Sequence, residues 1–160
     1  MMKIEQEALD AMLADAVTTF PDECCGFFFG KEEENSRHVT EILVVDNAKE
    51  GDRRRRFVIA AKDYLRAEQL AEQRDLQLLG VYHSHPNHPA IPSEHDRVSA
   101  QPNFSYIIIS IMDKEFEDIR SWRLNEVYQF EEELIDQTII TKIESNGNSN
   151  YSNTVKKIHQ

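Results

Sequence analysis

The stretch from Tyr82 to Arg97 holds most of the residues in this sequence that could do chemistry. It reads YHSHPNHPAIPSEHDR and contains four of the six histidines together with one aspartate. The residues that lead into it, LQLLGVYHSH, have a nearly continuous apolar start, which predicts a strand near the centre of a sheet. Because side chains alternate along a strand, His83 and His85 should project from one face and Ser84 from the other. Two imidazoles on one face can converge on one metal ion.

The third donor of such a site is left open by spacing alone. Asp96 follows His85 by eleven residues, far enough for a loop to fold back and offer a carboxylate. Two histidines and one aspartate suit catalytic zinc, which leaves its fourth position to a water of lowered pKa. A structural explanation competes for Asp96, because Ser93 and Asp96 also stand where a helix would have its N-cap and third residue in a capping box. The neighbouring His88 and His95 are further potential ligands, but we interpret both as exposed loop residues.

The composition is that of an ordinary globular domain. The chain has 160 residues, of which 40% are hydrophobic and 29% charged, and its formal net charge is -11. That charge argues against binding to nucleic acid or to an anionic membrane surface. No apolar run approaches the ~18 residues of a membrane span, and the acidic, amphipathic N-terminus argues against a secretory signal. We therefore expect a cytoplasmic protein with neither nucleic-acid nor membrane partners, and leave its oligomeric state open, a homodimer included.

The order of the predicted elements suggests an α/β (α+β) fold, with the helices and strands arranged around one sheet. We expect helices over about 5–19, 60–74 and 93–99, and strands at about residue 4 and over 24–30, 38–47, 56–60, 76–85, 106–112, 117–125 and 126–134. Residues 141–160 are small and polar without apolar period, which indicates a disordered tail after a single domain over 1–140.

Two other groups of residues allow competing interpretations. Cys24 and Cys25 provide no disulfide framework. A thiol nucleophile beside a histidine is conceivable, but a strand position favours buried apolar fillers. A run of four arginines precedes the fourth predicted strand: Arg53, Arg54, Arg55 and Arg56. The run is either a solvated loop or a contact for a substrate carboxylate or an acidic partner, since arginine binds carboxylates bidentately.

The histidine stretch resembles the signature of the JAMM (MPN+, JAB-domain) metallopeptidases, which is H-x-H, seven residues, a serine, then x-x-D. His83, His85, Ser93 and Asp96 match that signature. A second segment, FPDECCGFFFG, is similar to the family's usual P-x-E-x-C-G and assigns Glu23. Two separated motifs in the right order make the resemblance specific, and it extends over about residues 4–134.

The resemblance implies a JAB/MPN fold, which is a mixed β-sheet flanked by helices. That fold is similar in outline to the cytidine deaminases, whose own zinc signature is absent here. It implies Zn²⁺ held by His83, His85 and Asp96. It also implies that Glu23 takes a proton from the zinc-bound water and later delivers it to the leaving amine, while Ser93 hydrogen-bonds the oxyanion. Without the resemblance, Glu23 would be interpreted as a surface glutamate.

Small stand-alone prokaryotic members of this family are similar to hydrolases of ubiquitin-like sulfur-carrier proteins, of the CysO-cysteine type. We therefore expect a zinc-dependent hydrolase of a peptide or isopeptide bond at the C-terminal tail of such a carrier, with the tail bound in an open groove. Two alternatives are a catalytically silent MPN-like binding scaffold and a zinc amidase that acts on small molecules. The complete set of matched residues favours the enzyme over the scaffold.

Overall fold

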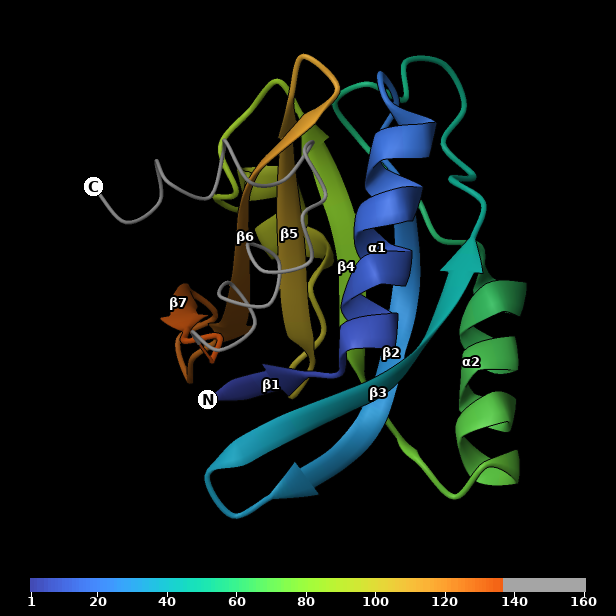
Figure 1. Cartoon of the computed structure of the whole chain (residues 1–160), viewed down its shortest axis with the longest axis vertical. Coiled ribbons are helices and arrows are strands. Elements are labelled where there is room, and N and C mark those ends of the chain that lie inside the picture. Colours follow the sequence, from blue (N-terminus) through green and yellow to red (C-terminus); the bar gives the residue numbers. More distant parts are fainter. Residues whose placement is uncertain (137–160) are drawn as a thin grey trace.

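The computed structural model describes residues 1–136, so the predicted tail over 141–160 lies outside the described residues. Within them, seven strands form one mixed sheet and three helices accompany it (Figure 1). The strands are β1 (Met2–Ile4), β2 (Cys25–Glu33), β3 (Ser36–Val45), β4 (Gln77–Pro86), β5 (Ser105–Met112), β6 (Glu115–Leu124) and β7 (Phe130–Glu133). The helices are α1 (Gln6–Thr19), α2 (Ala61–Gln73) and α3 (Glu94–Ser99). None of these helices combines the length and the apolar character that a membrane span requires.

The central strand is β4, as its apolar sequence predicted. The sheet order is β1-β3-β2-β4-β5-β6-β7, with β4 parallel to β5 and antiparallel to β2. At the two edges, the Met2 N–H donates to the Leu134 carbonyl at 2.7 Å and the Asp136 N–H donates to the Met2 carbonyl at 2.8 Å. The chain after β7 therefore joins β1, which curls the sheet back toward itself.

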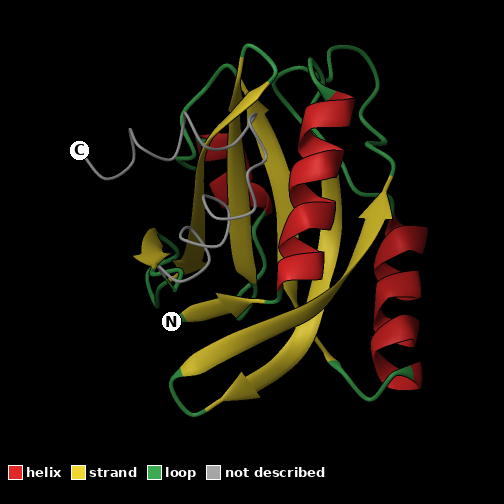
Figure 2. Ribbon diagram, in the orientation of Figure 1, coloured by secondary structure: helices red, strands yellow, loops and turns green. Residues whose placement is uncertain are grey.

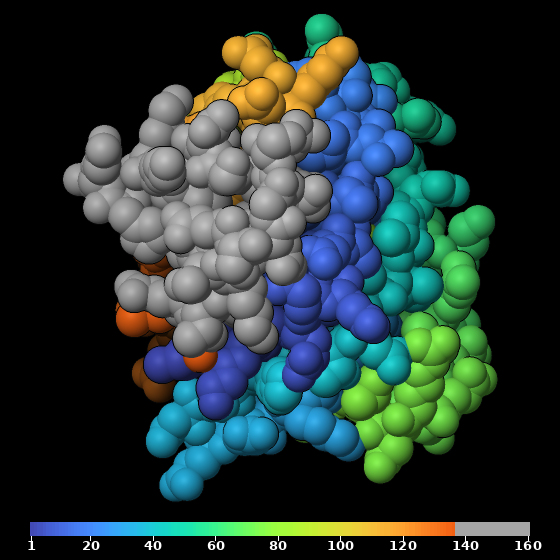
Figure 3. Space-filling view, in the orientation of Figure 1, coloured from blue at the N-terminus to red at the C-terminus, as the bar shows by residue number. Residues whose placement is uncertain are grey.

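Each face of the sheet carries a hydrophobic cluster under one of the two longer helices (Figure 2). Phe28 of β2 lies in the cluster with α1, whereas Phe27 and Phe29 lie in the cluster with α2. Strand β4 alternates in the same way, since Tyr82 faces α1 and Val81 faces α2. Residues of α1, β3 and α2 follow one another across the surface in Figure 3. By this alternation the histidines that follow Tyr82 on β4 project toward the α2 side.

The strand predicted over 56–60 is wrong, because this segment bonds to a loop and not to the sheet. The Val58 carbonyl accepts from the Ala48 N–H at 2.8 Å, and the Val58 N–H donates to Asn47 Oδ1 at 3.1 Å. Phe57 still packs in the cluster with α2. The apolar residues of this segment are therefore explained by burial against the cluster, without pairing to a strand.

The strand predicted over 126–134 is shorter than expected, since β7 covers only Phe130–Glu133. Asn125 closes a turn before it, because its Oδ1 accepts from the N–H groups of Val127 and Gln129, both at 3.0 Å. Strand β2 is longer than expected, and β3 begins and ends two residues earlier than the strand predicted over 38–47, so only residues 34–35 remain as their turn.

We expect Gly80→Ala to destabilise the fold through a direct steric conflict. A Cβ at Gly80 would lie 1.8 Å from the carbonyl oxygen of Ser105 on β5, the strand next to β4. The free energy of unfolding, measured by urea denaturation, should fall by about 3 kcal/mol. Gly51→Ala is the control, because a Cβ at Gly51 would have no atom within 4 Å. Since Gly51 has φ +84°, this substitution should lower the free energy of unfolding by about 1 kcal/mol through backbone strain alone. Equal losses for the two variants would contradict the steric explanation.

Candidate active site

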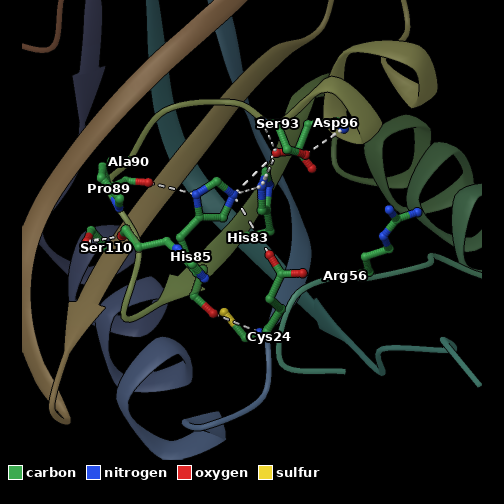
Figure 4. Close-up of polar contacts among 12 residues, drawn as sticks. Cys24, Arg56, His83, His85, Pro89, Ala90, Ser93, Asp96 and Ser110 are labelled. Carbon is green, nitrogen blue, oxygen red and sulfur yellow. Dashed lines mark hydrogen bonds and ion pairs between the residues drawn. The ribbon is translucent and has the colours of Figure 1, made fainter. Parts of the chain in front are cut away.

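Four ionisable side chains meet at the end of β4 (Figure 4). His83 and His85 come from β4, Asp96 from α3, and Glu23 from the residues just before β2. The two Nε2 atoms are 3.1 Å apart, and Asp96 Oδ2 lies 3.4 Å from that of His83 and 3.3 Å from that of His85. Glu23 Oε1 is 3.8 Å from His85 Nε2. These side chains are between 1% and 10% exposed, so the cluster is nearly closed to solvent.

Both imidazoles turn Nε2 toward the cluster. His85 Nδ1 lies 2.8 Å from the Pro89 carbonyl oxygen. Because a carbonyl only accepts, Nδ1 carries a proton, and Nε2 is the nitrogen that a metal ion would bind. Burial lowers the pKa of His83, which favours its neutral form. The orientation of the two rings therefore suits a metal ion placed between their Nε2 atoms.

The separations within this cluster fit one divalent cation. Donor atoms bound at about 2.0–2.1 Å to one tetrahedral ion lie about 3.4 Å from one another. The distances among His83 Nε2, His85 Nε2 and Asp96 Oδ2 are 3.1, 3.4 and 3.3 Å. Glu23 with the same two histidines forms an overlapping triad, whose donor atoms lie within 4.8 Å of one another. Asp96 is the better third donor, because it approaches both nitrogens more closely than Glu23 approaches His85.

Asp96 caps α3, as one of its two interpretations predicted, and its carboxylate also reaches the two histidines. The Ser93 N–H donates to Asp96 Oδ2 at 2.9 Å, and the Asp96 N–H donates to Ser93 Oγ at 3.0 Å, which completes the capping box of α3. The same Oδ2 faces both imidazoles. Although burial disfavours its charged form, the contacts with His83, His85 and the Ser93 N–H hold the pKa of Asp96 below its usual range. The helix start therefore aims an ionised carboxylate into the cluster.

Glu23 is a buried carboxyl with an unused oxygen. Within the described chain its Oε2 is buried and has no hydrogen-bond partner. Burial raises the pKa of Glu23 to about 9, the negative charge of Asp96 adds to this shift, and Arg56 opposes it. A group placed in this way can accept and return a proton, and a cation in the cluster would favour its charged form.

The loop between β4 and α3 is held by the next two strands. The His88 carbonyl accepts from Ser110 Oγ at 2.5 Å, and the Ala90 carbonyl accepts from Trp122 Nε1 at 3.0 Å. These bonds lie on either side of Pro89, whose carbonyl orients the His85 ring. Hydrogen bonds to β5 and β6 therefore fix the loop whose Pro89 carbonyl contacts His85.

His88 and His95 lie outside the group of donor atoms. His88 is exposed, as expected. The expectation of an exposed loop residue is wrong for His95, which is half-buried in α3 and has its Nδ1 3.2 Å from Arg56 Nη1. Cys24 and Cys25 are buried and free. Burial raises the pKa of Cys24 well above its ordinary value and that of Cys25 to about 12, so both thiols stay protonated near neutral pH. This supports their interpretation as apolar fillers.

Ser84 positions Glu23, a role that sequence reasoning missed. Its Oγ accepts from the Cys24 N–H at 2.8 Å, and its N–H donates to the Cys24 carbonyl at 3.3 Å. Because Cys24 directly follows Glu23, this pair of bonds fixes the Glu23 backbone against β4. Strand alternation correctly placed fully buried Ser84 on the face opposite the histidines, but no sequence signal indicated its partner.

Asn47 is the second residue that sequence reasoning missed, and it brings the arginine loop to the site. Its Nδ2 donates to the carbonyls of Glu23 and Arg56, at 3.1 and 3.0 Å. The Glu23 N–H also donates to the Arg53 carbonyl at 2.8 Å. The arginine run is therefore bonded to Glu23 directly at its Arg53 end and through the Asn47 side chain at its Arg56 end, although the run and Glu23 lie about thirty residues apart in sequence.

Known proteins similar to this chain include two peptidase-type relatives. It is 28% identical over 127 residues to the CysO-cysteine peptidase of Mycobacterium tuberculosis, which covers 78% of this chain and 83% of that protein. It is 30% identical over 123 residues to the desampylase of Pyrococcus furiosus, with coverage of 77% and 81%.

Solved structures share the fold. A solution structure from Desulfitobacterium hafniense has a TM-score of 0.75 at 27% identity and covers 85% of this chain and 92% of its own. A crystal structure of a JAB1/MPN domain protein from Archaeoglobus fulgidus has a TM-score of 0.53 at 19% identity, with coverage of 85% and 95%, and shows the fold alone. Residues 5–125 match the family described as prokaryotic homologs of the JAB domain. The chain thus has the JAB/MPN fold and belongs to the prokaryotic JAB-domain family.

Proposed function

We propose that this JAB-type hydrolase is zinc-dependent and cleaves a peptide or isopeptide bond at the C-terminal tail of a ubiquitin-like sulfur-carrier protein. The observation that carries the proposal is the buried convergence of His83, His85 and Asp96, with Glu23 beside them. The names of the relatives, CysO-cysteine peptidase and desampylase, support a substrate of this class.

The metal site consists of His83, His85 and Asp96. When bound there, zinc supplies a Lewis acid and a water of lowered pKa. The chain holds the three donors in advance, because the Pro89 carbonyl fixes the His85 ring and the Ser93 N–H fixes the Asp96 carboxylate. Little rearrangement is then needed on metal binding.

Glu23 moves the proton. Amide hydrolysis requires a base for the attacking water and an acid for an amine that leaves poorly as an anion. The Glu23 carboxyl lies 3.8 Å from His85 Nε2, and its Oε2 has no hydrogen-bond partner in the described chain. It can therefore take the proton first and return it to the leaving nitrogen.

Ser93 stabilises the oxyanion. Its Oγ already accepts the Asp96 N–H at 3.0 Å, which leaves the hydroxyl proton to donate elsewhere. Ser93 is exposed and lines a cavity together with Glu23 and His85. A hydroxyl in this place can donate to the charge that develops on the substrate carbonyl oxygen.

The principal test is Glu23→Gln, assayed on a ubiquitin-like carrier with a C-terminal extension. The variant should keep its bound zinc, measured by mass spectrometry of the metal, and lose turnover by about 10²–10⁴-fold, since an amide cannot exchange the proton. Glu34→Gln, in the exposed turn between β2 and β3, is the control and should match the wild type. A Glu23→Gln protein that cleaved at the wild-type rate would refute this mechanism.

Removing a ligand should remove the metal. We expect His83→Ala and Asp96→Asn to lose nearly all of the roughly one zinc ion bound per chain. His88→Ala, a nearby histidine outside the donor group, should retain it. The zinc content of each variant after dialysis measures the loss or retention of the metal. Full zinc occupancy in His83→Ala would mean that other residues form the site.

Ser84→Ala should lower kcat while leaving KM and bound zinc nearly unchanged. The variant deletes the acceptor for the Cys24 N–H, so Glu23 is less well held; a loss of about 10-fold corresponds to about 1.4 kcal/mol. Ser84→Thr keeps the hydroxyl and should restore most of kcat. Loss of zinc in Ser84→Ala, or no rescue by threonine, would argue against positioning.

A further inference from the structure

The contacts of the arginine loop leave one guanidinium without a protein partner. Arg53 Nε donates to the Lys49 carbonyl at 2.8 Å, and Arg54 pairs with Asp52 at 3.0 Å. Arg56, as described above, lies against His95. Among residues 1–136, Arg55 makes no hydrogen bond or ion pair. The charge of Arg55 also acts on Asp52, but the Asp52 carboxylate is already hydrogen-bonded to Arg54. Arg55 therefore lies next to the active site without a hydrogen-bonded carboxylate.

Arg55 lines the same cavity as the proposed catalytic residues. This cavity has a volume of about 270 Å³, and its walls include Glu23, His85, Ser93, Arg54 and Arg55. The bonds from Glu23 and Asn47 to the backbone of the loop keep the arginines at this wall.

A second cavity, of about 210 Å³, lies on the His83 side of the cluster. Its walls include the rings of Phe57, Tyr64 and Tyr106 and contain no lysine or arginine. The Phe57 ring stacks on His83, with centroids 4.5 Å apart. The two cavities therefore differ in character, since one is cationic and the other aromatic and apolar.

The position of Glu23 determines which cavity receives the leaving residue. The leaving amine takes its proton from Glu23, and Glu23 lines the cationic cavity but not the aromatic one. In a C-terminal amino acid, the amine nitrogen and the carboxylate are bonded to the same α-carbon. A single leaving residue would therefore bring its carboxylate into the cavity that Arg55 lines. A longer extension, or a lysine side chain in an isopeptide, would not place a carboxylate there.

From this arrangement we infer that Arg55 binds the free α-carboxylate of the residue released, so that the enzyme prefers to remove a single C-terminal residue from its carrier. The guanidinium suits this ligand because it can donate two parallel hydrogen bonds to a carboxylate. The inference rests on the proposed function and specifies the leaving group at the same site.

Two matched substrates test the inference on the full chain loaded with zinc. Both are a ubiquitin-like carrier extended by one residue beyond its C-terminal glycine, one ending in the free acid and the other in the carboxamide. We expect wild-type kcat/KM, measured by intact mass, to favour the acid by about 10- to 100-fold. Arg55→Gln should reduce kcat/KM for the acid to about the value for the amide. Arg53→Gln removes the same charge from the same loop and should keep the wild-type ratio.

Binding provides a readout that does not depend on turnover. In the Glu23→Gln background, calorimetry should show tighter binding of the acid than of the amide, and Arg55→Gln should abolish the difference. Equal kcat/KM for acid and amide in the wild type would overturn the inference and leave the proposed function intact. An unchanged preference in Arg55→Gln would overturn the role of Arg55. Cleavage of neither substrate would overturn the proposed function, and the inference with it.

Discussion

The interaction on which this site depends is the mutual compensation of ionisable groups buried at the end of β4. The carboxyl groups of Glu23 and Asp96 approach the imidazoles of His83 and His85 at distances between 3.3 and 3.8 Å, in a cluster nearly closed to water. Burial and the charge of Asp96 together raise the pKa of Glu23, so the protein alone cannot easily hold both carboxylates charged. A divalent cation would relieve this conflict, because it would attract both carboxylates and could bind the Nε2 atoms of the two imidazoles.

Three members of the cluster are each held by a different part of the fold. His85 is oriented by the Pro89 carbonyl in a loop that β5 and β6 fix, and Asp96 is oriented by the cap of α3. Glu23 is held through Cys24 by Ser84, from the opposite face of the central strand. Because strands and a helix carry these supports, the donor side chains have few alternative orientations.

Local patterns in the sequence predicted much of this arrangement. Apolar runs and alternation placed β4 in the centre with both histidines on one face, and helix-capping residues predicted the start of α3. They failed over 56–60, where burial of Phe57 has the same apolar signature as a strand. Glu23 was assigned only through the resemblance, because its approach to the histidines depends on the antiparallel register that sets Cys25 opposite His83. Such pairing between distant segments leaves no local periodicity, and for the same reason the partners of Ser84 and Asn47 were missed.

Glu23 is also the point at which the cluster meets the arginine loop. Its N–H donates to the Arg53 carbonyl and its carbonyl accepts from Asn47, while the next residue is bonded to Ser84 of β4. The proposed proton carrier and the loop cations are therefore parts of one hydrogen-bonded unit fixed to the central strand. A substrate group bound by the loop would lie near that carboxyl, because hydrogen bonds tie the loop backbone to Glu23. Recognition of the leaving residue and proton transfer to it would then depend on the same few backbone bonds.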